Sequence, residues 1–145
     1  MRVVLQRTKR AKCTVNRNVT GEIDCGFLVL ASFTDGDDEA TLQRMAKKIA
    51  NLRVFPDEAG KMNLSIRDIG GAILSISQFT LYANTNEGNR PSFTDSLNPV
   101  AAEKLYHRFN TLLSEYGIRV EVGSFGAHME IELINDGPVT IMLEF

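Results

Sequence analysis

The sequence contains few histidines and cysteines, the side chains that most often bind transition metals or act as a general base or nucleophile. Its 145 residues include no tryptophan, two histidines and two cysteines. Cys13 and Cys25 are not in a metal-binding spacing, and we find no cysteine, carboxylate or second histidine at ligand spacing from His107 or His128. We therefore expect no metal site, no disulfide and no cofactor. Nothing in the sequence points to a Ser-His-Asp triad, although its three residue types are present.

Long hydrophobic runs are also missing. No apolar segment approaches the length of a membrane span, and the N-terminus lacks the apolar stretch of about 7–15 residues that a signal peptide needs. A cytoplasmic protein with no membrane contact is therefore expected. Apolar residues make up 43% and charged residues 23%, which is typical of a globular protein. The length suits one domain, residues 1–145.

The charge of the chain is nearly balanced, with a formal net charge of −2. Such a protein does not attract nucleic acid as a whole, and we expect no DNA partner. The first 17 residues differ, because they contain basic residues and no acidic ones: Arg2, Arg7, Lys9, Arg10, Lys12 and Arg17. This segment either faces phosphates or forms the solvated face of a strand pair.

The pattern of apolar residues predicts an α/β chain. Short strands are expected over 2–7, 11–16, 119–123, 129–134 and 139–144, a buried strand over 27–33 and a central strand over 72–83. A first helix is expected to begin after Asp37 or Asp38, and a second to begin with Asn98 as its cap and Pro99 at its first position. Gly117 lies just past the end of the second helix.

Two polar side chains interrupt the predicted central strand. In a strand, Gln78 and Thr80 point to one face, among apolar neighbours, and Ser77 and Phe79 point to the other. A buried polar group without a partner costs about 1–3 kcal/mol. These side chains therefore either have internal partners or line a site.

Three further stretches are rich in glycine and polar residues. Residues 88–93 and 123–129 are expected to be loops, in which glycine lets a ligand approach the backbone closely. Residues 135–138 read Asn-Asp-Gly-Pro between two expected strands. These residue types are typical of turns, so the local sequence predicts a turn there.

Taken together, these stretches resemble the bacterial-type D-aminoacyl-tRNA deacylases, a family of chirality-editing enzymes. One signature of the resemblance is 77–81, Ser-Gln-Phe-Thr-Leu, and the other is 135–140, Asn-Asp-Gly-Pro-Val-Thr. Motifs at 6–7, 21–23, 55–63, 89–93 and 123–129 follow in the family's order, so the resemblance runs nearly end to end. The sequence departs from the family at Thr8-Lys9 and at Asp24-Cys25.

The resemblance implies a compact α/β fold with a barrel-like, mostly antiparallel sheet and two main helices, acting as a homodimer. It places the active sites at the dimer interface, where the signature of one subunit meets Gly137 and Pro138 of the other. In relatives this Gly-Pro bond is cis. The catalytic group would be Ser77, Gln78, Phe79 and Thr80. The substrate would be held by Phe125, Gly126, Ala127, Met129, Arg7 and Asn135, with Arg7 buttressing the Gly-Pro loop.

The implied reaction is hydrolysis of the ester at the 3′ acceptor end of D-aminoacyl-tRNA and of glycyl-tRNA mischarged on tRNA(Ala). Gly137 and Pro138 would bind the α-amino group and exclude an L side chain. Backbone N–H groups near Phe79 and Thr80 would stabilise the oxyanion, and either Thr80 or the ribose 2′-hydroxyl would activate the attack. One alternative is a non-catalytic dimer that binds the tRNA end, and another is a small-molecule binding protein.

Overall fold

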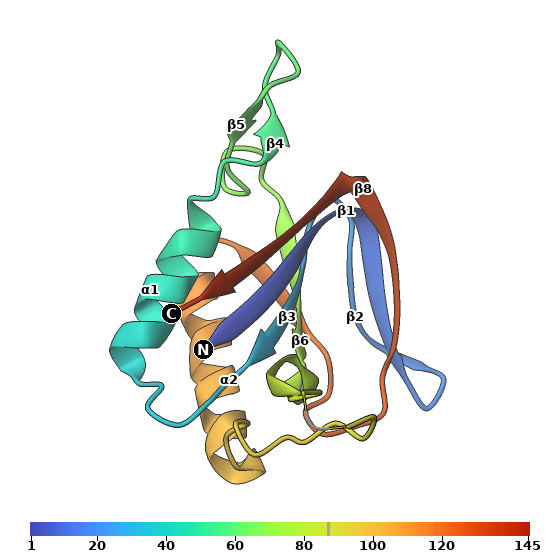
Figure 1. Cartoon of the computed structure of the whole chain (residues 1–145). Helices are drawn as coiled ribbons and strands as arrows, with labels where there is room; N and C mark the ends of the chain where they lie inside the picture. The colour runs from blue at the N-terminus through green and yellow to red at the C-terminus, as the bar shows by residue number, and fades with distance from the viewer. Residues whose placement is uncertain (87) are drawn as a thin grey trace.

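The computed structural model describes residues 1–86 and 88–145. Within these residues a six-stranded sheet has the order β2-β1-β3-β6-β7, and β8 also pairs with β1 (Figure 1). Its strands are β1 (Arg2–Val15), β2 (Asn18–Ile23), β3 (Gly26–Ser32), β6 (Ala72–Ser77), β7 (Arg119–Val122) and β8 (Glu130–Glu144). A separate hairpin of β4 (Phe55–Pro56) and β5 (Met62–Leu64) projects from one end of the molecule.

The sheet curls into a nearly closed barrel. β1 pairs antiparallel with β2, β3 and β8, whereas β3–β6 and β6–β7 are parallel pairs. The edge strands β2 and β7 come close together, since a Cβ on Gly21 would lie 2.9 Å from the Val122 carbonyl oxygen. This confirms the expected α/β fold with a barrel-like, mostly antiparallel sheet and two helices.

The two helices, α1 (Glu39–Ala50) and α2 (Pro99–Glu115), lie side by side against the sheet (Figure 1). The predicted caps are confirmed: Asp38 accepts a hydrogen bond from the Thr41 N–H, and Asn98 accepts one from the Ala101 N–H. The apolar faces of both helices pack on β1, β3 and β6 to form the main core. No helix in residues 1–86 and 88–145 is long and apolar enough to cross a membrane.

The prediction of a turn at 135–138 is wrong. β8 is one continuous strand, and both of its halves pair with β1, so the flanks of 135–138 do not pair with each other. Gln6 pairs with Thr140 and Thr8 with Asn135, which leaves four residues of β8 opposite Arg7 alone. The segment is therefore a bulge, at which β8 bends sharply (Figure 1). β1 is likewise one strand where two were predicted.

The predicted central strand is also too long. β6 ends at Ser77, and a short 3₁₀ helix, η1 (Phe79–Tyr82), replaces the rest. The neighbouring strand β3 ends at Ser32. The last bond between the two segments runs from the Gln78 N–H to the Ala31 carbonyl at 2.8 Å, so residues 79–82 have no β3 residue to pair with. The alternation that assigned Gln78 and Thr80 to one face therefore does not apply.

Candidate active site

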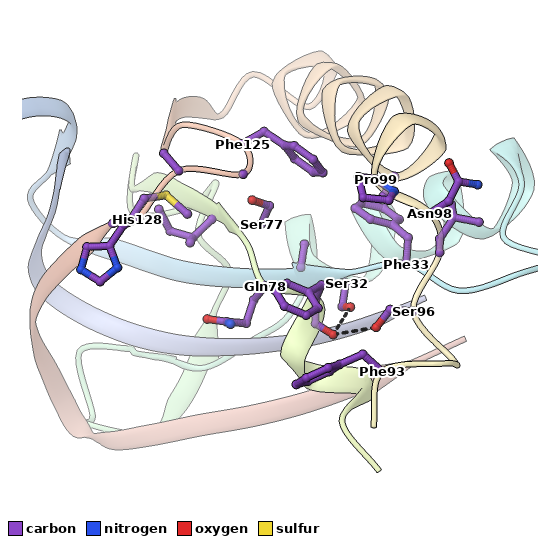
Figure 2. A pocket seen from close by; sticks show the side chains of 18 of the residues that line it. Ser32, Phe33, Ser77, Gln78, Phe93, Ser96, Asn98, Pro99, Phe125 and His128 are labelled. Atoms are coloured by element: carbon purple, nitrogen blue, oxygen red, sulfur yellow. Dashed lines mark hydrogen bonds between the residues drawn. The ribbon is translucent and has the colours of Figure 1, made fainter. Parts of the chain in front are cut away.

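A pocket of about 540 Å³ opens where the parallel strands β3, β6 and β7 end. The carboxyl ends of parallel strands are where α/β sheets commonly bind ligands. The end of β3, the start of η1, the segment before α2 and the loop after β7 supply its walls (Figure 2). These elements are far apart in sequence, so only the fold brings them together.

Most of the predicted site residues lie in this pocket. Its lining contains three of the four predicted catalytic residues and four of the six predicted substrate-binding residues: Ser77, Gln78, Phe79, Phe125, Gly126, Ala127 and Met129. Thr80 is exposed just beyond the lining, and its hydroxyl oxygen accepts a hydrogen bond of 2.5 Å from Gln78 Nε2. The two signature side chains are therefore coupled to each other.

The wall around Phe125 is built on a buried tyrosine. The rings of Tyr106 and Phe125 are 5.8 Å apart, and the Tyr106 hydroxyl donates to the Ser75 carbonyl at 2.7 Å. Burial raises the pKa of Tyr106, so the hydroxyl stays protonated and remains a donor. Gly123 makes room for Met129, another lining residue, because a Cβ at position 123 would lie 2.6 Å from the Met129 sulfur.

Two exposed aromatic rings stand at the mouth of the pocket. Phe79 is 58% exposed and Phe93 is 36% exposed, and their rings meet edge to face with centroids 5.0 Å apart. Large apolar side chains with this much exposure, gathered beside a pocket, are typical of a surface that binds a partner or a flat ligand.

The backbone at the start of η1 offers free hydrogen-bond donors. The Gln78 N–H is bonded to Ala31, and the Leu81 N–H is bonded to the Gln78 carbonyl at 3.2 Å. The N–H groups of Phe79 and Thr80 lie between these two. They belong to the first turn of η1, and the first N–H groups of a helix have no carbonyl acceptor within the helix. Across the described part of the chain, neither group has an assigned backbone acceptor.

The bulge in β8 forms a second centre. The Gly137–Pro138 peptide bond is cis, and both residues are exposed. Arg7, which is 8% exposed, donates from Nε to the Asp136 carbonyl at 3.1 Å and from a second nitrogen to the Val54 carbonyl. Arg7 thus ties the bulge to the segment after α1.

Asn135 closes the bulge from the other side. Its Oδ1 accepts from the Val139 N–H at 3.2 Å, and its Nδ2 donates to Thr140 Oγ1 at 3.0 Å. These bonds span Gly137 and Pro138 and use the polar atoms of the side chain. The predicted residues Arg7, Asn135, Gly137 and Pro138 are therefore gathered with one another, but not with the pocket.

Within this chain the bulge faces the middle of β1, whereas the pocket lies beside the N-terminal end of β1. Val3 pairs with Ala31, which lines the pocket, while Thr8 pairs with Asn135 in the bulge. Five residues of extended chain separate these positions, a span of roughly 17 Å. Figure 1 shows the same arrangement, with η1 at the lower end of the barrel and the bend of β8 at the upper end.

Five further residues line the pocket although no role in the site was predicted for them: Ser32, Phe93, Ser96, Asn98 and His128. Phe93 and His128 lie in the family motifs 89–93 and 123–129, and Asn98 was predicted only as a helix cap. Figure 2 shows His128 on the side of the pocket away from Asn98 and Pro99. Its place between Ala127 and Met129 was the only available hint.

One statement about histidine was wrong. Glu103 lies one helical turn from His107, with its carboxylate 3.8 Å from Nε2, and both side chains are exposed on α2. The pair lies outside the pocket lining. Among the described residues no group of three His, Cys, Asp or Glu side chains is arranged to hold a metal.

The basic N-terminal residues do not gather on one surface. Arg2 donates to the Leu81 carbonyl at 2.6 Å and to Glu144 at 2.8 Å, Arg7 is buried, and Lys12 pairs with Glu132 at 2.8 Å. Lys9, Arg10 and Arg17 are exposed, and Lys9 Nζ lies 3.9 Å from the Asp136 carboxylate in the bulge. Phosphate contacts by this segment therefore stay a prediction.

Comparison with known proteins identifies the family. The family model described as D-Tyr-tRNA(Tyr) deacylase matches residues 4–144. The chain belongs to this family. It is 55% identical to the D-aminoacyl-tRNA deacylase of Deinococcus radiodurans and 52% identical to that of Halalkalibacterium halodurans, each over 99% of both chains. The resemblance inferred from the two signatures is confirmed, and the family is one of hydrolases that act on ester bonds.

Solved structures with the same fold extend beyond close relatives. A structure titled "c-Myc DNA Unwinding Element Binding Protein" is similar with a TM-score of 0.94 and 40% identity, over 100% of this chain and 99% of that one. A structure of a probable eukaryotic D-amino acid tRNA deacylase is similar with a TM-score of 0.85 over 98% and 97%. At 18% identity, the second likeness establishes the fold alone.

Proposed function

We propose that the protein hydrolyses the ester bond of D-aminoacyl-tRNA and releases the free D-amino acid and tRNA. The observation that carries this proposal is the pocket at the end of β6, which gathers the first signature with residues 125–129. The membership of the chain in the deacylase family supports the same reaction. We also propose that the protein acts in the cytoplasm.

The terminal adenosine of tRNA is the ligand that suits the pocket. A volume of about 540 Å³ falls within the usual range for a small-molecule site. Phe125 lies on one wall, and Phe79 and Phe93 stand at the mouth. Aromatic side chains stack on nucleic acid bases with about 1–3 kcal/mol per base, and tolerate any base.

The ester carbonyl would lie at the start of η1. The free N–H groups of Phe79 and Thr80 can stabilise the negative oxygen that forms when water attacks. In other hydrolases, losing one such donor costs about 2.7–4 kcal/mol in the barrier. The neighbouring Ser77 and Gln78 would shape the ester site.

The role of Thr80 follows from its hydrogen bond. A nucleophilic hydroxyl needs a base that takes its proton. The Thr80 oxygen instead accepts a hydrogen bond from the Gln78 amide, and an amide N–H is a donor and not a base. We therefore assign Thr80 and Gln78 to orienting the ester and the ribose, and the ribose 2′-hydroxyl to activating the attacking water.

Selection against L substrates would come from the β8 bulge of a second subunit. By strand spacing, Asn135 at the start of the bulge lies roughly 17 Å along β1 from Ala31 in the pocket of the same chain, too far for that bulge to touch an aminoacyl group in this pocket. A homodimer that brings the exposed bulge of one chain to the exposed mouth of the other would complete the site.

The bulge would act as a steric gauge. Backbone carbonyls of Gly137 and Pro138 would accept hydrogen bonds from the α-amino group, and an L side chain would be driven against the Gly-Pro backbone. Arg7 and Asn135 hold this backbone in place. Glycine has no side chain to exclude, so glycyl-tRNA, including that mischarged on tRNA(Ala), would also be hydrolysed.

Deacylation of matched D-Tyr-tRNA and L-Tyr-tRNA by the purified protein tests the proposal. We expect rapid loss of the D ester with the L ester spared, and the same rates with EDTA present. If tRNA or DNA binds but neither ester is lost, the protein is a nucleic-acid-binding module instead. Loss of activity with EDTA, restored by a metal, would overturn the metal-free mechanism.

A further inference from the structure

The carbonyl oxygen of Phe79 receives hydrogen bonds from two serine hydroxyls. Ser96 Oγ donates to it at 3.0 Å and Ser32 Oγ at 3.4 Å, as the dashed lines in Figure 2 show. Ser32 is the last residue of β3 and is 2% exposed, whereas Ser96 lies in the segment before α2 and is partly exposed. Two separate parts of the chain therefore hold one peptide group.

Holding this carbonyl also fixes a neighbouring donor. The Phe79 carbonyl and the Thr80 N–H belong to one planar peptide unit, in which they point in opposite directions. With its oxygen held by Ser32 and Ser96, the peptide must direct the Thr80 N–H the other way, back toward Gln78 and the end of β6. That is the side on which the chain has free donors.

The Phe79 side chain adds little to this hold. It is 58% exposed, with the 36% exposed Phe93 beside it, at the start of the four-residue turn η1. The far end of η1 is fixed better, because Tyr82 is 8% exposed and the Leu81 carbonyl accepts a hydrogen bond from Arg2 at 2.6 Å. At the Phe79–Thr80 peptide the serine hydroxyls therefore add to the turn's own hydrogen bonds an orientation that packing does not supply.

We propose that Ser32 and Ser96 are positioning residues, which aim the Thr80 N–H at the oxyanion of the reaction by holding the Phe79 carbonyl. This inference rests on the proposed function. An oxyanion donor works only if it is aligned before the charge develops, and hydrogen bonds weaken steeply with misalignment. Both serine hydroxyls donate to the Phe79 carbonyl, so we assign them a role that acts through this peptide.

Steady-state kinetics of Ser32→Ala, Ser96→Ala and the double variant test the proposal on D-Tyr-tRNA. A net hydrogen bond is equivalent to roughly a two- to tenfold change in rate. We expect kcat to fall about threefold in each single variant and about tenfold in the double variant, with KM unchanged. Ser96→Thr keeps a hydroxyl, so Ser32→Ala with Ser96→Thr should keep the kcat of Ser32→Ala alone and not fall to that of the double alanine variant.

Ser114→Ala is the matched control. The Ser114 hydroxyl also donates to a backbone carbonyl at 3.0 Å, that of Asn110, but on α2 outside the pocket. Its kcat should equal that of the unchanged protein. Wild-type kcat in the folded double variant would overturn the proposal, and if that variant does not fold, wild-type kcat in Ser96→Ala alone would do so. If the wild-type protein itself has no deacylase activity, the result refutes the proposed function and not the role of the serines.

Discussion

One nitrogen of Arg7 contacts Asp136 twice: Nε lies 3.1 Å from the Asp136 carbonyl oxygen and 3.1 Å from its carboxylate Oδ2. The guanidinium also reaches the Val54 carbonyl, so a buried side chain of β1 joins the β8 bulge to the segment after α1. A bulge leaves part of its backbone without hydrogen bonds to the partner strand. The hydrogen bonds from Arg7 stabilise this part of β8 instead.

Replacing Arg7 by lysine should loosen the bulge. A lysine keeps the charge but cannot reach Asp136 and Val54 at once, because it lacks the planar fork of arginine. We expect the free energy of unfolding to fall by about 2 kcal/mol in urea titrations. Arg119→Lys is the control, at an exposed pair with Glu121, and should change it by less than about 0.5 kcal/mol. Equal stability of the two variants would contradict the structural role of Arg7.

Gly137→Ala should disturb the bulge through backbone geometry. Gly137 has φ +127°, and a Cβ there would lie 2.9 Å from Val139 Cγ2. We expect a loss of stability of about 1–3 kcal/mol, measured by thermal and urea unfolding. Gly60→Ala separates the two causes, because Gly60 also has positive φ but open space around it. A larger loss at Gly60 would show that crowding at Gly137 is unimportant.

The bulge also marks a limit of reading the sequence. Asn, Asp, Gly and Pro suit a tight turn and a bulge equally well, because both need unusual backbone angles at single residues. The choice depends on β1, which is long enough to pair with both halves of β8. That is a long-range relation, and no local pattern contains it.

Helix starts, by contrast, were predictable. Asp38 and Asn98 cap the helices through bonds to N–H groups three residues ahead, so the whole signal lies within one turn. The pocket falls between these cases. Residues 77–79 were found through a family signature, and residues 125–127 and 129 through a further family motif. Ser32 and Ser96 enter only because β3 and the segment before α2 end beside Phe79.

Tyr106→Phe should cost little, and Tyr106→Ala much more. The Ser75 carbonyl keeps a second donor, the Gly123 N–H at 3.0 Å, so losing the hydroxyl should cost about 1 kcal/mol. Losing the buried ring should cost about 3–5 kcal/mol and free Phe125 to move, raising KM for aminoacyl-tRNA. Unfolding titrations and steady-state kinetics measure both effects. An unchanged KM in a folded Tyr106→Ala protein would disconnect Tyr106 from the pocket.

Acid should remove the stabilisation that Asp57 gives to the β4–β5 hairpin. The Lys61 N–H, with that of Ala59 and the Asn63 amide, holds the pKa of the Asp57 carboxyl below its ordinary value of 3.8. A depressed carboxyl pKa stabilises the fold above the unfolded-state pKa, and this is lost as pH falls through the folded-state pKa. Thermal midpoints should therefore favour the unchanged protein over Asp57→Asn at pH 7, with a difference that shrinks below about pH 4.

Glu58→Gln is the control for this titration. It removes the same charge from the adjacent exposed position without touching the N–H groups of the loop. A thermal midpoint difference for Asp57→Asn that stays constant from pH 7 to pH 3 would contradict the electrostatic origin of the effect.

The central claim is that the pocket of one subunit works with the bulge of the other. A heterodimer, purified through two different tags, tests it when one subunit carries Gln78→Ala with Phe79→Ala and the other carries Gly137→Ala. The second subunit then holds the single working pocket. If the site is shared, that pocket faces the intact bulge of its partner, and the heterodimer should hydrolyse D-Tyr-tRNA while sparing L-Tyr-tRNA. Hydrolysis of both esters, as in the Gly137→Ala homodimer, would contradict the account.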